Sequence, residues 1–112
     1  GLQKTGGKLK VKKKTEEEKK LINAQNQAML DVFLSVWNKR GPYSESSGEY
    51  LGPECKTIFC HHLISKSSRP ELRYEEDNIM LLTWNEHSRV EAGYPDQKVI
   101  ERTNQAKIRF NV

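Results

Sequence analysis

The first regular pattern of apolar residues along the chain has the spacing of an α-helix. Thr15 followed by Glu18 has the form of a capping box, in which the two side chains satisfy backbone N–H groups at a helix N-terminus. The apolar stripe that follows recurs at three- and four-residue intervals and comprises Ile22, Met29, Leu30, Phe33, Leu34, Val36 and Trp37. Gly41-Pro42 should stop the helix. We therefore expect a helix from just after Thr15 to about Lys39, with its stripe packed in the core.

Two shorter apolar stretches further along the chain favour β-strands. Residues 56–64 and 78–84 are dominated by β-branched, aromatic and other apolar side chains. The segments before and between them, residues 43–53 and 65–73, are polar and contain several serines, so we expect loops there. The two strands would pair as a hairpin.

Two further helices are predicted after the second strand. Residues 85–92 fit a helix of about two turns, which Gly93 would end. Pro95 can open a last helix that continues to about Lys107. The expected fold is therefore α+β, with a long N-terminal helix, a two-stranded hairpin and a short helix, followed by a C-terminal helix.

The composition limits the class of protein. The chain has 112 residues, of which 35% are hydrophobic and 30% charged, which is enough for one domain with a small core. No apolar run approaches the roughly 20 residues that a membrane-spanning helix needs, and no signal peptide is recognisable. The first residue is Gly1 rather than Met, which suggests a trimmed chain or a fragment. We expect no membrane partner.

Two cysteines, Cys55 and Cys60, are too few for a four-thiolate metal site or a disulfide scaffold. A reducing, cytoplasmic setting is therefore expected. Both cysteines lie in or beside the first predicted strand, and we expect them to be buried strand residues.

The positive charge is concentrated at the N-terminus. The net charge of the chain is +4; residues 1–20 hold eight lysines and three glutamates, whereas residues 21–112 hold eleven basic and twelve acidic residues. Residues 1–14 should form a disordered basic arm, which leaves residues 15–112 as the folded domain. A lysine-rich arm attracts the phosphate backbone of nucleic acids, but it also occurs as a solvated tail. The sequence leaves both interpretations open.

Three histidines supply the candidate chemistry. His61, His62 and His87 lie within 27 residues of one another, on the first predicted strand and the helix after the hairpin. Two imidazoles could bind a divalent metal ion and leave positions for phosphate and water, and the third could act as a general base. Adjacent strand residues point to opposite faces, so His61 and His62 can serve one site only if the strand ends or twists there. The alternative is that the histidines are surface residues that cluster by chance.

At these residues the chain resembles the HNH nuclease motif of the ββα-metal superfamily. In that motif a His pair lies at the end of a strand, an Asn precedes the second strand, and a His or Asn follows on the helix. Here the corresponding residues are His61-His62, Asn78 and His87. The resemblance implies a ββα-metal (HNH) finger with a motif core at residues 54–93.

A narrower similarity points to one family within that superfamily. The run Pro-Glu-Leu-Arg-Tyr at residues 70–74, followed by Asn78-Ile79, is similar to the phage lambda NinG (Rap) recombination endonuclease family. That family also has a helix before the motif. The similarity covers about residues 20–95, within an HNH endonuclease domain of residues 15–112.

The resemblance assigns a role to each residue of the motif. His62 matches the general base that takes a proton from the attacking water. His61 and His87 match the metal ligands. Asn78 matches a structural residue whose side-chain hydrogen bonds hold the loop and orient the base.

Four basic residues near the motif are candidate DNA contacts. They are Lys66, Arg69, Arg73 and Arg89. For Arg73 a salt bridge to one of the acidic residues at 75–77 is an equal alternative to a phosphate contact.

The chain departs from the family at one informative place. Many HNH proteins, including NinG-like ones, carry two Cys-x-x-Cys pairs that bind a structural zinc, and the corresponding places here hold Tyr43 and Ser46, then Thr83 and Glu86. We therefore expect no structural zinc and ordinary packing in its place, with Trp84 and Tyr43 filling the volume.

The implied function is a metal-dependent DNA endonuclease that leaves 5′-phosphate and 3′-hydroxyl ends. Branched recombination intermediates such as a Holliday junction are one candidate substrate. Mg²⁺ or Mn²⁺ is the expected cofactor, while Zn²⁺ or Ni²⁺ also suits imidazole ligands. Two alternatives stay open: a catalytically inactive HNH-fold DNA-binding module, and a metal-binding structural protein without a nucleic-acid partner.

The same resemblance bears on assembly and location. A homodimer through the long helix would suit a branched substrate with two strands to cut. The implied location is the cytoplasm of a bacterium or of a phage-infected host cell.

Overall fold

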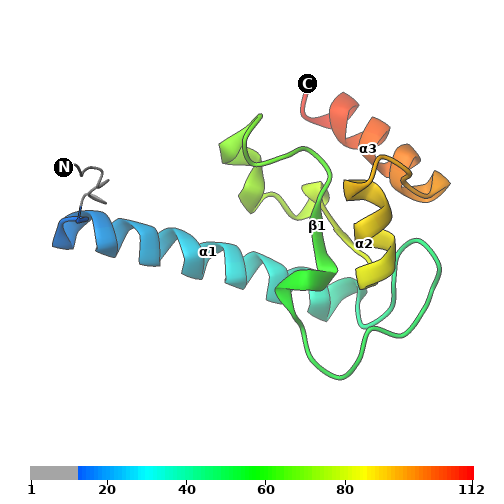
Figure 1. The fold of residues 1–112 in the computed structure, drawn as a ribbon, viewed down its shortest axis with the longest axis horizontal. Helices are drawn as coiled ribbons and strands as arrows, with labels where there is room; N and C mark the ends of the chain where they lie inside the picture. Colours follow the sequence, from blue (N-terminus) through cyan, green and yellow to red (C-terminus); the bar gives the residue numbers. More distant parts are fainter. Residues whose placement is uncertain (1–12) are drawn as a thin grey trace, which may run out of the picture.

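The computed structural model describes residues 13–112 of the chain. These residues form a small α+β domain with three α-helices and a two-stranded antiparallel sheet (Figure 1). The predicted α+β class is confirmed. The predicted basic arm, residues 1–14, lies outside the described residues except for Lys13 and Lys14. Within residues 13–112, no helix combines the length and the apolar character needed to cross a membrane.

The first helix, α1, spans Glu16–Arg40 and begins and ends as predicted. The capping box is present, because Thr15 N–H donates to Glu18 Oε1 at 2.8 Å and Glu18 N–H donates to Thr15 Oγ1 at 3.1 Å. Gly41 caps the C-terminus and donates its N–H to the Trp37 carbonyl. Local signals therefore define both ends of the helix.

Only the C-terminal half of α1 packs against the rest of the domain. Phe33 and Val36 are buried, but Leu30 and Leu34 are 42% and 50% exposed, so the expectation that the whole stripe is core was wrong. A helix of 25 residues is about 37 Å long. Figure 1 shows its N-terminal half projecting beyond the body, and the radius of gyration is accordingly 17.8 Å rather than the roughly 13 Å of a compact domain this size.

The sheet is shorter than the apolar stretches predicted. Strand β1 (Cys60–His62) pairs antiparallel with β2 (Ile79–Leu81), and His61 lies opposite Met80. The residues before each strand form 3₁₀ turns instead, η2 (Thr57–Phe59) and η4 (Glu76–Asn78), and the predicted loop at 65–73 contains the start of a third, η3 (Pro70–Tyr74). Apolar composition predicted both strands, but it does not show at which residue a backbone turn replaces pairing between the strands.

The two later helices lie within two residues of their predicted bounds. Helix α2 spans Trp84–Glu91 and α3 spans Gln97–Arg109. Trp84, expected in the strand, is instead the first residue of α2, because Thr83 and Glu86 form a second capping box there. Gly93, with φ +91°, follows the end of α2 as predicted.

Strand β2 lies between two halves of the core. Ile79 and Leu81 pack in a cluster with Phe33 and Val36 of α1, as do Leu51 and Cys60. Met80, and Leu82 just after the strand, point the other way, into a cluster with side chains of α3 and the β1–β2 connection. The period-two alternation of a strand thus ties α1 to one face and α3 to the other.

The edge of β2 that does not pair with β1 is covered by charged side chains. Glu45 accepts from Leu81 N–H at 2.8 Å through Oε2, and its own N–H donates to the Leu81 carbonyl. Arg40 and Arg102 both donate to the Ile79 carbonyl and both pair with Glu45. These contacts satisfy backbone groups that would otherwise be unpaired.

The region where the resemblance implied replacement of a zinc is held by buried hydrogen bonds. Ser44 Oγ donates to Glu86 Oε1 at 2.6 Å, and Thr83 N–H donates to the same oxygen at 2.8 Å. The expectation for Trp84 and Tyr43 was wrong, because these side chains are 58% and 53% exposed. Hydrogen bonds between the 43–50 loop and the start of α2, rather than aromatic packing, connect the two segments.

The cysteines are free thiols and differ in environment. Cys60 is buried at the start of β1, as expected, and burial raises the pKa of its thiol to about 12. Cys55 is only half-buried and lies in the loop before η2, so its assignment to a buried strand was wrong. Its Sγ lies 3.8 Å from the Phe33 carbonyl, against α1.

We predict that Ser44→Ala destabilises the domain by about 1.5–3 kcal/mol, because it removes a hydrogen bond to a buried carboxylate. Urea unfolding followed by circular dichroism measures the change. Ser67→Ala, in an exposed loop, is the matched control and should change the free energy of unfolding by less than about 0.5 kcal/mol. Equal stabilities of the two variants would contradict the prediction.

A pH dependence follows from the same carboxylate. Burial alone would raise the pKa of Glu86, but hydrogen bonds from Ser44, Ser47 and Thr83 outweigh burial and hold that pKa below its ordinary value. Its contribution to stability should therefore be complete above about pH 4.3 and decline as the pH falls through the lower pKa of the folded state. Melting temperatures from pH 7 to pH 3 should fall less steeply for Glu86→Gln than for the natural chain.

Candidate functional site

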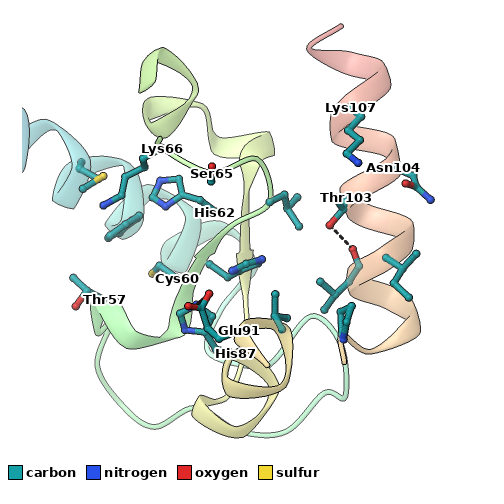
Figure 2. Close-up of a pocket in the computed structure, with 18 residues that line it drawn as sticks. Thr57, Cys60, His62, Ser65, Lys66, His87, Glu91, Thr103, Asn104 and Lys107 are labelled. Carbon is teal, nitrogen blue, oxygen red and sulfur yellow. Dashed lines mark hydrogen bonds and ion pairs between the residues drawn. The ribbon is translucent and has the colours of Figure 1, made fainter. Parts of the chain in front are cut away.

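A cleft of about 710 Å³ opens beside the sheet, and all three histidines line it. His61 and His62 reach it from β1 and His87 from α2, while α1 and α3 supply further walls. Figure 2 shows His87 and Glu91 together at one end and Lys107, Asn104 and Thr103 on α3. We call this feature the histidine cleft. It is the larger of the two cavities described for residues 13–112.

His61 and His87 form the closest pair of rings in the cleft. Their ring centroids lie 5.1 Å apart, although they are 26 residues apart in the chain. His61 is 9% exposed, and burial, with repulsion from charge on His87 and His62, lowers the pKa of His61 to about 4. At neutral pH this imidazole is therefore uncharged, as a metal ligand must be.

His62 lies on the other side of β1, as the pleat of a strand requires. Its ring packs against Phe33 of α1 at 5.6 Å between centroids, and its Nε2 lies 3.1 Å from the Arg73 carbonyl. A carbonyl only accepts, so Nε2 carries the proton and Nδ1 has the free lone pair. Burial is the main cause that lowers the pKa of His62, which favours the neutral form. Because β1 ends at His62, both adjacent histidines still border one cleft.

Asn78 is fully buried and holds the connection between the strands. Its Oδ1 accepts from Ile64 N–H at 2.8 Å, and its Nδ2 donates to the carbonyls of Ile64 and Leu72 at 3.0 and 3.1 Å. Leu72 directly precedes Arg73, whose carbonyl bonds His62. Asn78 therefore anchors the segment that orients the His62 ring.

The four predicted DNA contacts lie in different environments. Arg69 pairs with Glu71 at 2.6 Å and Arg89 with Asp96 at 2.9 Å, so a carboxylate already neutralises part of each charge. The guanidinium of Arg73 lies over the Tyr74 ring, 4.8 Å from its centroid, and makes no ion pair among the described residues. Of the four, Lys66 alone lines the histidine cleft.

The donor atoms of the cleft fit part of a metal site. Within residues 13–112, no three side chains of His, Cys, Asp or Glu are grouped to hold a metal ion. The imidazoles of His61 and His87 are nevertheless close together, and one is buried and neutral. Imidazole nitrogen is a common ligand of Zn²⁺, Ni²⁺ and Co²⁺, so two such ligands suit an ion whose remaining positions are taken by water and phosphate oxygens.

Two groups of cleft residues were not predicted from the sequence. Glu91 lies one turn after His87, with Oε2 3.8 Å from His87 Nε2, and its i,i+4 spacing on a predicted helix was a usable signal. The residues of α3 that line the cleft had no such signal, because only the tertiary fold places this helix beside the histidines.

Comparisons with known proteins give no independent support for a relationship: no family model, no curated protein and no solved structure matches this chain. The likeness to the HNH motif therefore depends on the residues and the geometry described above.

We predict that the chain binds Ni²⁺ or Zn²⁺ through His61 and His87. At a metal concentration about 100 times Kd, binding should raise the free energy of unfolding by about 2.7 kcal/mol and the melting temperature by several degrees. His61→Ala should abolish this shift, whereas His62→Ala, one residue away on the opposite face of the strand, should keep it. A thermal-shift titration measures both, and an unchanged shift in His61→Ala would contradict the assignment.

We also predict that Asn78→Ala destabilises the domain by about 3 kcal/mol, because it removes three buried hydrogen bonds and leaves the N–H and the carbonyl of Ile64 without these partners, while the Leu72 carbonyl keeps its hydrogen bond from Glu75 N–H. Denaturant unfolding is the measurement. Asn38→Ala, on the exposed surface of α1, is the matched control and should have little effect. A small change in Asn78→Ala would show that the β1–β2 connection does not depend on this side chain.

Proposed function

We propose that this chain is a metal-dependent DNA endonuclease with an HNH-type ββα-metal finger formed by β1, β2 and α2. The observation that carries the proposal is the arrangement of the three histidines. The ring centroids of His61 and His87 lie 5.1 Å apart. His62, whose Nε2 is hydrogen-bonded to the Arg73 carbonyl, borders the same cleft. This arrangement supports separate roles for a ligand pair and a base.

The proposed reaction is hydrolysis of a phosphodiester bond to 5′-phosphate and 3′-hydroxyl ends. His62 Nδ1 takes the proton from the attacking water, because Nε2 is committed to the Arg73 carbonyl. Phe33 and the Arg73 carbonyl keep the ring in one orientation, so the base needs little reorganisation before reaction. Asn78 acts as a positioning residue, through the segment that carries Arg73.

His61 and His87 would hold a divalent metal ion. Such an ion supplies positive charge that stabilises the pentacoordinate phosphate and the departing 3′ oxygen. Lys66, in the wall of the cleft, adds positive charge for the phosphate backbone.

The test is cleavage of a labelled four-way junction, a linear duplex and a single strand with Mg²⁺, Mn²⁺ or Ni²⁺. His62→Ala should lower the rate about 10²- to 10⁴-fold, which is the usual contribution of a general base. The same variant should keep the Ni²⁺-dependent thermal shift, so that loss of the base is distinguished from loss of the fold or the metal.

Two results would contradict the proposal. Cleavage by the His62→Ala variant at the same rate as by the natural chain would exclude His62 as the general base. No cleavage with any metal, together with tight and salt-sensitive DNA binding, would favour the alternative of a catalytically inactive HNH-fold DNA-binding module.

The finer expectations about partners and location are part of this proposal. A branched substrate would suit a homodimer formed through α1, whose exposed leucines Leu21, Leu30 and Leu34 are available on its surface. Residence in the cytoplasm of a bacterium or an infected host follows from the resemblance alone.

A further inference from the structure

The wall of the histidine cleft contributed by the C-terminal part of the chain lies outside the HNH-like segment. It is formed by Pro95 and one face of α3, with Val99, Ile100, Thr103, Asn104 and Lys107. The face changes in character along the helix. Pro95, Val99 and Ile100 are apolar. Asn104 and Lys107, one to two turns later, are polar (Figure 2).

The size and lining of the cleft suit one nucleotide rather than a duplex. Its volume of about 710 Å³ is in the range of sites that bind a single small molecule, roughly 300–1,000 Å³. Ile100 is 38% exposed, so its side chain is available to the face of a base. A base within a duplex is covered by its stacked neighbours and cannot pack against this wall, whereas an unpaired base can.

Two lysines on different walls supply charge for the phosphates. Lys66 belongs to the connection after β1 and Lys107 to α3, and both line the cleft (Figure 2). Neither forms an ion pair among residues 13–112, in contrast to Arg69 and Arg89. Both ammonium groups are therefore available to the phosphates on either side of a base.

We propose that the histidine cleft binds an unpaired stretch of DNA, with a base against Pro95 and Ile100 and the neighbouring phosphates at Lys66 and Lys107. This inference rests on the proposed function, because it takes the phosphate to be cut to lie at the histidines. It names the substrate class: single-stranded segments, or the unpaired nucleotides at a branch point, in preference to continuous duplex.

The experiment measures DNA binding without cleavage. Fluorescein-labelled 12-nucleotide oligo-dT and a blunt-ended 12-base-pair duplex of two annealed strands are titrated with the chain in EDTA, at several salt concentrations, and anisotropy gives Kd. Oligo-dT should bind at least about tenfold more tightly than the duplex, since only an unpaired base can bury its face against the apolar wall in addition to the phosphate contacts. Equal affinities for the two probes would overturn the inference.

Lys107→Gln tests the charge of the α3 wall. It should weaken oligo-dT binding and reduce the slope of log K against log salt by about 0.7, the value for one phosphate contact on a single strand. Lys98→Gln is the matched control, because Lys98 is an exposed lysine of the same helix that does not line the cleft. Identical behaviour of the two variants would overturn the inference.

Ile100→Ala tests the apolar wall in the same way. It should weaken oligo-dT binding by at least about threefold, because a base would bury less apolar surface. Ile108→Ala is the control, since Ile108 is 82% exposed on α3 and is not a lining residue. Circular dichroism melts establish that each variant is folded before its affinity is measured, and equal losses in both would overturn the inference.

The single-strand site and the endonuclease proposal can be contradicted independently of each other. If oligo-dT is preferred and Lys107→Gln weakens it, but no metal supports cleavage, the hydrolytic proposal fails and the single-strand site stands. If DNA is cut by a His62-dependent reaction but Lys107→Gln and Ile100→Ala bind like their controls, the single-strand site fails and the endonuclease stands.

Discussion

The fold depends on the burial of β2, a strand of only three residues. Ile79, Met80 and Leu81 have no exposed surface, because each face of the strand packs on a different part of the core. One edge pairs with β1, and the other is satisfied by Glu45, Arg40 and Arg102. This strand contacts α1, the 43–50 loop and α3, so it holds the three segments in fixed positions relative to one another.

The same strand determines how the histidines are divided. Residues opposite each other in an antiparallel pair project on the same side of the sheet. The His61 side chain therefore lies on the same face as Met80, and the His62 side chain lies on the same face as Ile79. His61 thus faces the side occupied by α2 and α3 and meets His87, while His62 faces α1 and meets Phe33. The pleat separates two adjacent residues into different environments, which is the physical basis for assigning them different roles.

The fold and the candidate site share one buried side chain. Asn78 directly precedes β2, and its amide bonds the segment whose next residue, Arg73, presents a carbonyl to His62. Because Asn78 directly precedes β2, the strand fixes its position, and the orientation of the His62 ring depends in turn on Asn78. The Ser44–Glu86 hydrogen bond fixes the start of α2 in a similar way, because it connects Glu86, the residue before His87, to the 43–50 loop. The hydrogen bonds of Asn78 and of Glu86 are all buried, and both sets hold a histidine-bearing segment in place.

The sequence by itself determined the order of the α-helices and strands and placed the helix ends to within two residues, because caps, glycine and proline act within a few residues: the Thr15–Glu18 box, Gly41 and Gly93 lie where predicted. It also singled out the three histidines and Asn78, whose motif is local. Only the tertiary structure decided that Leu30 and Leu34 of the α1 stripe are exposed, that the strands are three residues long, and that Lys107 borders the same cleft as Lys66. These features depend on which distant surfaces cover one another, and neither periodicity nor composition carries that information.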